Sequence, residues 1–151
     1  MVMLGATESA LYGLYIHVNK EALEIWMNRN DSDGARKKMK ATFTIANMWK
    51  CLDATDAKLC ETAQALYEKT IEFGSHPNPA SVAMAIKMSR NPQGAQFKLN
   101  YLSANTGVIA GTMKSVAQTG MLVLLVFRLV FPKRYDEIGL AAQLPALRQG
   151  L

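Results

Sequence analysis

The chain has 151 residues, of which 50% are hydrophobic and 19% are charged, so it suits one folded domain and excludes a disordered or low-complexity protein. Its net charge of +5 is unevenly distributed: residues 76–151 carry eight Lys/Arg against two Asp/Glu, and residues 1–75 carry nine against ten. A basic half of this kind indicates either a polyanion partner or a solvated basic surface.

Two amphipathic helices are expected in the first third of the chain. Residues 7–28 and 34–51 place apolar side chains at three- and four-residue intervals. Polar residues separate the two runs, and Ser32 or Asp33 is available as the second N-cap. The second run opens with four cations, which we interpret as a solvated face, with an anion or partner contact as the alternative. These cations are Arg36, Lys37, Lys38 and Lys40.

A third helix is expected to begin at Asp53 or Asp56, both good N-caps, and to run to Phe73. Gly74 suits the left-handed position after a helix end, and the two prolines that follow cannot continue a helix. The sequence therefore predicts a sharp boundary near residue 74.

The hydrophobic period changes from 3.6 to 2 after residue 80. Residues 82–88 and 96–101 alternate between apolar and polar side chains around an Asn-Pro-Gln-Gly loop, which predicts a β-hairpin at about 81–102. An isolated hairpin is marginally stable, so we expect it to pack on the helices. An amphipathic helix over residues 80–88 is the alternative.

The last long element is a predicted helix over residues 105–131, ended by Pro132. Only 13 residues separate Lys114 from Arg128, whereas a membrane span needs about 20 apolar residues. We therefore expect the central helix of a bundle rather than a transmembrane segment. The fold class is mainly α (α+β): a four-helix-bundle-like domain over residues 1–132, with one hairpin before the longest, most buried helix. A tail over residues 133–151 either forms a short helix or stays irregular.

The sequence offers no metal or cofactor site. Cys51 and Cys60 are the only cysteines, and their surroundings favour two free thiols over one disulfide. Two cysteines and two well-separated histidines match no zinc spacing, and no Glu-x-x-His pair or phosphate-binding loop occurs. We expect neither metal nor cofactor.

Three segments carry a resemblance to a known family: residues 8–16 with Glu-Ile-Trp at 24–26, residues 65–78, and residues 127–132. Together they resemble uncharacterised bacterial helical proteins that look distantly related to the HEPN superfamily. The resemblance covers most of the chain. It implies a helical bundle, often dimeric, of the kind found in toxin–antitoxin, abortive-infection and other defence systems.

Catalytic HEPN members resemble metal-independent ribonucleases that use an Arg, four to six variable residues and a His. In this chain His76 follows the predicted helix end, but the nearest preceding cation is Lys69, with six residues between them. Lys does not reproduce the bidentate contact of Arg with phosphate. Asn78 is a further candidate, and the alternative role of His76 is to bond the carbonyls of its own helix end.

We expect a small bacterial, cytoplasmic interaction protein without catalytic activity. It would form a homodimer through apolar helix faces and would bind a protein partner but no membrane. One alternative is an RNA-binding or metal-independent RNA-cleaving HEPN-like enzyme centred on Lys69 and His76. A second alternative is a small-ligand pocket lined by Met and aromatic residues.

Overall fold

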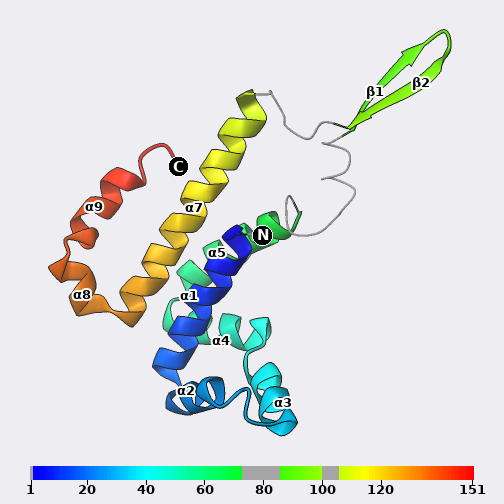
Figure 1. The fold of residues 1–151 in the computed structure, drawn as a ribbon. Coiled ribbons are helices and arrows are strands. Elements are labelled where there is room, and N and C mark those ends of the chain that lie inside the picture. Colours follow the sequence, from blue (N-terminus) through cyan, green and yellow to red (C-terminus); the bar gives the residue numbers. More distant parts are fainter. Residues whose placement is uncertain (1, 73–85, 100–105) are drawn as a thin grey trace.

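A computed structural model describes residues 2–72, 86–99 and 106–151, and its mainly helical fold has one antiparallel hairpin before the longest helix, as the sequence predicts. The first segment forms the helices α1 Val2–Val18, α2 Lys20–Met27, α3 Asp33–Thr42, α4 Ile45–Thr55 and α5 Ala57–Thr70. The later segments form β1 Ile86–Asn91, β2 Gly94–Leu99, α7 Thr106–Val130, α8 Pro132–Glu137 and α9 Leu140–Leu147. Figure 1 shows their order along the chain.

Two of the expected helices are each divided in two, so the prediction of continuous helices over 7–28 and 34–51 is wrong. Asn19 has an extended backbone, and its side-chain amide donates to the Tyr15 carbonyl oxygen at 3.0 Å, closing α1. Thr44 is the N-cap of α4, where its hydroxyl accepts from the Asn47 amide at 3.3 Å. The apolar period continues across both breaks, which is why periodicity alone missed them.

The predicted N-caps are confirmed at two helices. Ser32 accepts a hydrogen bond from the Ala35 amide at 3.0 Å, and Asp56 accepts one from the Leu59 amide at 2.9 Å. Each bond satisfies an amide that the first turn of a helix leaves without a partner. Asp56 therefore fixes the start of α5, although the predicted end near residue 74 lies outside the described residues.

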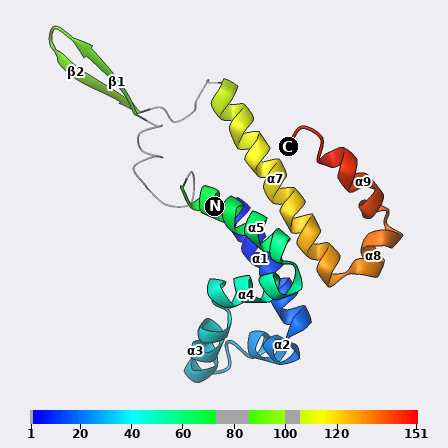
Figure 2. The ribbon, with the colours of Figure 1, turned by 180° about the vertical axis from the view of Figure 1, so that it is seen from behind.

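The hydrophobic core lies where α1 meets α4, α5 and α7. Figures 1 and 2 show α7 running beside α1, with α5 next to them and α2 and α3 at one end. Five large side chains here are almost completely buried: Leu11, Leu14, Met48, Leu52 and Val126. They come from α1, α4 and α7, so these three helices share one core.

Aromatic rings hold α2 and α3 against α1. The Phe43 ring lies 5.1 Å from Trp26, 5.4 Å from Tyr12 and 5.5 Å from Tyr15, measured between ring centroids. Phe43 itself is buried. Cys60, also buried, and the half-buried Cys51 are both free thiols, as the sequence predicts.

A partly buried hydrogen bond joins α1 to α5. The Tyr67 hydroxyl donates to the Glu8 carboxylate at 2.9 Å. Burial, together with the hydrogen bond and the negative charge of Glu8, raises the pKa of Tyr67 to about 12. The two helices that flank α7 are therefore connected by a polar contact as well as by packing.

The long helix α7 has two halves in different environments. Residues 118–130, its second half, contain Leu122, Val126 and Val130, which are buried in the core. Residues 106–117, its first half, contain no buried side chain among those described. The expectation of a most buried helix thus applies to the second half only. Within the described chain, residues Ile109–Val130 are long and apolar enough to cross a membrane, and 28% of the most apolar stretch is buried inside the fold.

The predicted tail contains two short helices, α8 and α9, which turn back beside α7 (Figures 1 and 2). Tyr135 and Leu144 pack with Met121 of α7 in a second small cluster. Gly139 joins α8 to α9 with a positive φ of 73°, a conformation that favours glycine. The domain boundary at residue 132 stays a prediction.

The hairpin forms, but its apolar pair Met88 and Phe97 does not pack on the helices. Met88 lies opposite Phe97 in the ladder, and these side chains are 54% and 68% exposed. The expectation that the hairpin packs its apolar face on the helices is therefore wrong, and so is the helical alternative for residues 86–88. Figure 1 shows β1 and β2 projecting away from the helices.

Candidate functional site: a basic groove between α5, α7 and the C-terminal segment

Two adjoining cavities form one groove between α5, the second half of α7 and the segment that ends α9. Their volumes are about 690 and 430 Å³, and they share Leu59, Thr62, Leu125 and Arg148 in their walls. The other lining residues are Asp56, Lys58, Ala65, Leu66, Lys69, Gln118, Met121, Leu122, Arg128, Leu129, Pro132 and Leu151. We refer to this feature as the groove.

The floor of the groove is made of leucines from two helices. Leu59 and Leu66, on α5, are half-buried, as are Leu125 and Leu129 on α7. Their inner sides complete the core, and their outer sides remain available to a ligand. A binding partner would therefore need an apolar surface of its own.

Four cations stand around this floor. Lys58 and Lys69 come from the two ends of α5, Arg128 comes from α7, and Arg148 caps the end of α9; all four are exposed. Ion pairs among the described residues are confined to Arg36–Asp33 and Arg134–Glu137, so no groove cation is neutralised by one. Among the described residues that line the groove, the only acid is Asp56, whose carboxylate caps α5.

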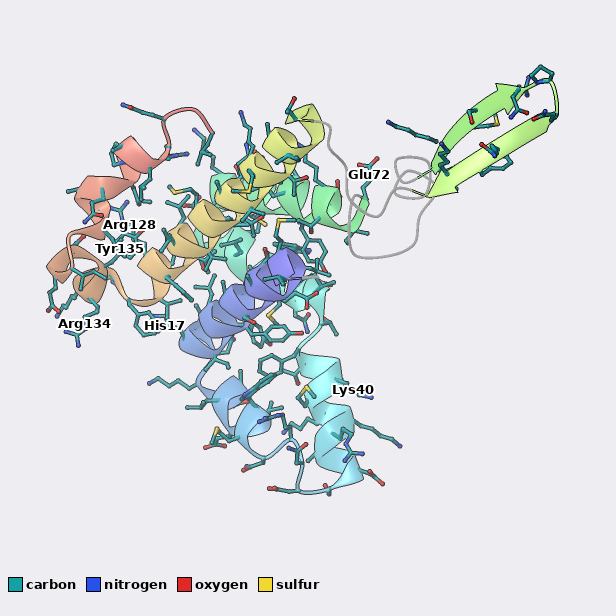
Figure 3. The ribbon with its side chains drawn as sticks, turned by 45° about the horizontal axis from the view of Figure 1, so that its top comes forward. His17, Lys40, Glu72, Arg128, Arg134 and Tyr135 are labelled. Carbon is teal, nitrogen blue, oxygen red and sulfur yellow. The ribbon has the colours of Figure 1, made fainter. Side chains whose placement is uncertain are left out.

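A buried hydroxyl lies close to one of these cations. Figure 3 shows Arg128 and Tyr135 next to each other where α7 meets α8. Burial raises the pKa of Tyr135, and the positive charge of Arg128 opposes that rise. The Tyr135 hydroxyl has no hydrogen-bond partner in the described part of the chain. Tyr135 thus anchors α8 by packing rather than by a polar contact.

The structure places one of the three predicted site residues. Lys69 is exposed on the last turn of α5 and lines the groove. His76 and Asn78 lie outside the described residues, so a constellation with Lys69 stays a prediction. No group of three His, Cys, Asp or Glu residues in the described ranges could hold a metal ion.

Sequence reasoning missed Lys58, Arg128 and Arg148 as parts of one site. These residues are far apart in the chain: α5 packs on α7, which brings Lys58 near Arg128, and α8 and α9 fold back along α7, which brings Arg148 to them. The available signal was the excess of cations after residue 76, which includes Arg128 and Arg148. That excess of cations indicated that a site would be positively charged, but it did not indicate where in the fold the site would lie.

Comparison of the chain with protein-family models, curated proteins and solved structures finds no match.

Proposed function

We propose that the chain is a non-catalytic interaction protein whose groove binds an acidic, amphipathic helix of a partner protein. The observation that carries the proposal is the pairing of a leucine floor with four cations that have no ion pair among the described residues. An amphipathic helix that lays its apolar face into a groove is a common recognition mode. Acidic side chains on its flanks would meet the cations on the groove walls.

The dimensions of the groove fit such a ligand. Its wall on α5 extends from Asp56 to Lys69, which at 1.5 Å per residue is about 20 Å. That length accommodates between three and four turns of a bound helix. Lys58 and Lys69 then lie near opposite ends, and each can pair with one end of the ligand.

RNA is the alternative occupant, because Lys69 belongs to the groove and to the predicted nuclease centre. Single-stranded RNA is held largely by stacking of its bases on aromatic side chains. The described residues that line the groove include no Phe, Tyr or Trp. The lining therefore favours a protein helix over RNA.

The wider context of this proposal comes from the sequence. A cytoplasmic location, a HEPN-like origin and a link to bacterial defence or toxin–antitoxin-like systems accord with a protein that acts by capturing a partner. Homodimer formation through apolar helix faces is a separate prediction, which sedimentation equilibrium tests.

The experiment is a titration of the full chain with a labelled helical peptide of about 14 residues. The peptide carries leucines at positions i, i+3, i+4 and i+7 and glutamates elsewhere; a scrambled peptide of the same composition is the reference. We expect K58E/K69E to weaken binding by about 10-fold or more, equivalent to about 1.4 kcal/mol. The control K37E/K40E makes the same charge change on α3, away from the groove, and should bind normally.

Three results would contradict the proposal. Equal binding of the scrambled peptide would show that charge alone is recognised. RNA binding with a steep salt dependence would assign the groove to RNA, provided that the RNA displaces the peptide and no longer binds K58E/K69E. A metabolite that stabilises the fold and competes with the peptide would instead support the small-ligand alternative.

A further inference from the structure

The first half of α7 presents an apolar face that no described residue covers. Ile109, Met113 and Val116 follow the i, i+4, i+7 spacing of one helix face, and they are 49%, 64% and 47% exposed. Soluble proteins seldom leave such contiguous apolar surface open without a binding role. Among the described apolar residues of this helix, those that are buried begin at Met121.

The hairpin also has an exposed apolar face, and its opposite face is basic. The register places Met88 opposite Phe97 on one face and Lys87 opposite Lys98 on the other. Directly opposed like charges destabilise a ladder, and an isolated hairpin is already marginal. This arrangement works against the stability of the free hairpin, and an anionic surface near the lysines would relieve it.

Both features belong to a long part of the chain without acids. Residues 73–135 contain no Asp or Glu and seven Lys or Arg. Four of these cations stand on the hairpin or the first half of α7: Lys87, Arg90, Lys98 and Lys114. No ion pair engages them among the described residues.

We propose that the hairpin and the first half of α7 dock on an anionic phospholipid surface. Apolar side chains such as Phe97 and Met113 would enter the boundary between headgroups and acyl chains. Lysines near such a surface are attracted by its negative potential, and their long stems let the charge reach the phosphates. This inference goes beyond the proposed function, because it uses neither the groove nor its ligand.

A second copy of the chain fits this surface less well. A twofold interface brings the same patch of both subunits together. Here it would bring the lysines and arginine of one acid-free segment against those of another, and like charges would meet. A nucleic acid would neutralise the lysines, and a single strand can stack a base on Phe97, but it would leave the aliphatic side chains Met88, Ile109 and Met113 without a suitable contact. Anionic lipid complements these apolar side chains, and the long stems of Lys87 and Lys98, on the opposite face of the hairpin, let their charges reach the phosphates.

The contact is docking on the surface and not a membrane span. Leu122, Val126 and Val130, in the second half of α7, are buried in the core with α1. Drawing the whole helix into a bilayer would remove these side chains from that core. The sequence prediction that α7 does not span a membrane is therefore compatible with this proposal, whereas the expectation of no membrane partner is not.

The test is sedimentation of the full chain with vesicles of phosphatidylcholine, with and without phosphatidylserine. We expect binding only where phosphatidylserine is present. K87Q/K98Q should lose about 25-fold in affinity, from roughly fivefold for each lysine near an anionic surface. The same change should not unfold the hairpin, because it removes two opposed like charges. The control K37Q/K40Q alters net charge equally on α3 and should bind like the unmodified chain.

The contribution of apolar side chains to vesicle binding is tested by serine variants on the docking surface and by a matched control on α2. Met113→Ser and Phe97→Ser should each weaken vesicle binding several-fold, since each removes a large apolar side chain that docking would bury. Met27→Ser, at a residue on α2 that is 66% exposed, should not. The groove variant K58E/K69E should also bind vesicles normally, so the failure of one proposal is distinguishable from failure of the other.

Three outcomes would overturn the inference. The first is no binding to phosphatidylserine vesicles, or equal binding to phosphatidylcholine alone. The second is a dimer in sedimentation equilibrium that Met113→Ser dissociates, without vesicle binding. The third is affinity for duplex DNA or RNA that K87Q/K98Q abolishes, again without vesicle binding.

Discussion

The two halves of α7 have similar side chains and opposite surroundings. In the second half, Leu122 and Val126 are buried in the core that α1 shares with α4. In the first half, Ile109 and Met113 follow the same helical spacing and are largely exposed. The comparison teaches that apolar periodicity identifies the face of a helix that needs covering, and does not say what covers it.

The largest expected effect separates the two halves by stability. Leu122→Ala should lower the free energy of unfolding by about 2–5 kcal/mol, because it leaves a cavity in a packed core. Met113→Ala, in the first half, should change it by less than about 0.5 kcal/mol. Urea unfolding of both variants measures the difference. A large loss for Met113→Ala would show that something covers the first half in solution, and the comparison would fail.

A smaller effect of opposite sign is expected where α8 packs on the second half. The Tyr135 hydroxyl is buried without a described partner, and a buried group of that kind is costly. Tyr135→Phe should therefore raise the free energy of unfolding by about 1 kcal/mol, measured in the same urea series. Tyr15→Phe, at a half-buried ring, is the control for loss of a hydroxyl. A clear loss of stability in Tyr135→Phe would mean that the hydroxyl has a partner.

The smallest effect concerns the helices that flank the second half. The pKa of Tyr67 is raised to about 12 in the folded chain, from 10.0 for an unperturbed tyrosine. Between these values the unfolded state releases the proton first, so stability is complete below pH 10 and falls as the pH rises toward 12. Spectrophotometric titration should show a tyrosine that ionises near pH 12, and Tyr67→Phe should remove it and flatten that part of the pH profile. An unchanged titration would mean that Tyr67 is not the tyrosine whose pKa is raised.

The sequence predicted elements that depend on local chemistry. Asp56 was expected as an N-cap because a carboxylate can accept from the first turn, and the structure confirms it. The hairpin followed from an alternation of period 2. The breaks at Asn19 and Thr44 were missed, since each depends on one side-chain hydrogen bond within an uninterrupted apolar pattern.

The groove could not be predicted in the same way. Lys69 was a candidate because of its distance from His76 in the chain, and its place in the groove depends on the helices across from it. Those helices are positioned by Tyr135 and Leu144, which pack on Met121. Contacts between residues this far apart leave no periodic signal in a single sequence.

Gly139 affects the shape of the groove. Its φ of 73° sets the angle between α8 and α9, and α9 carries Arg148 to the groove wall. An L-residue other than glycine is strained there, so a substitution would rotate α9 toward or away from α5. The position of Arg148 on the groove wall thus depends on one backbone dihedral outside the groove.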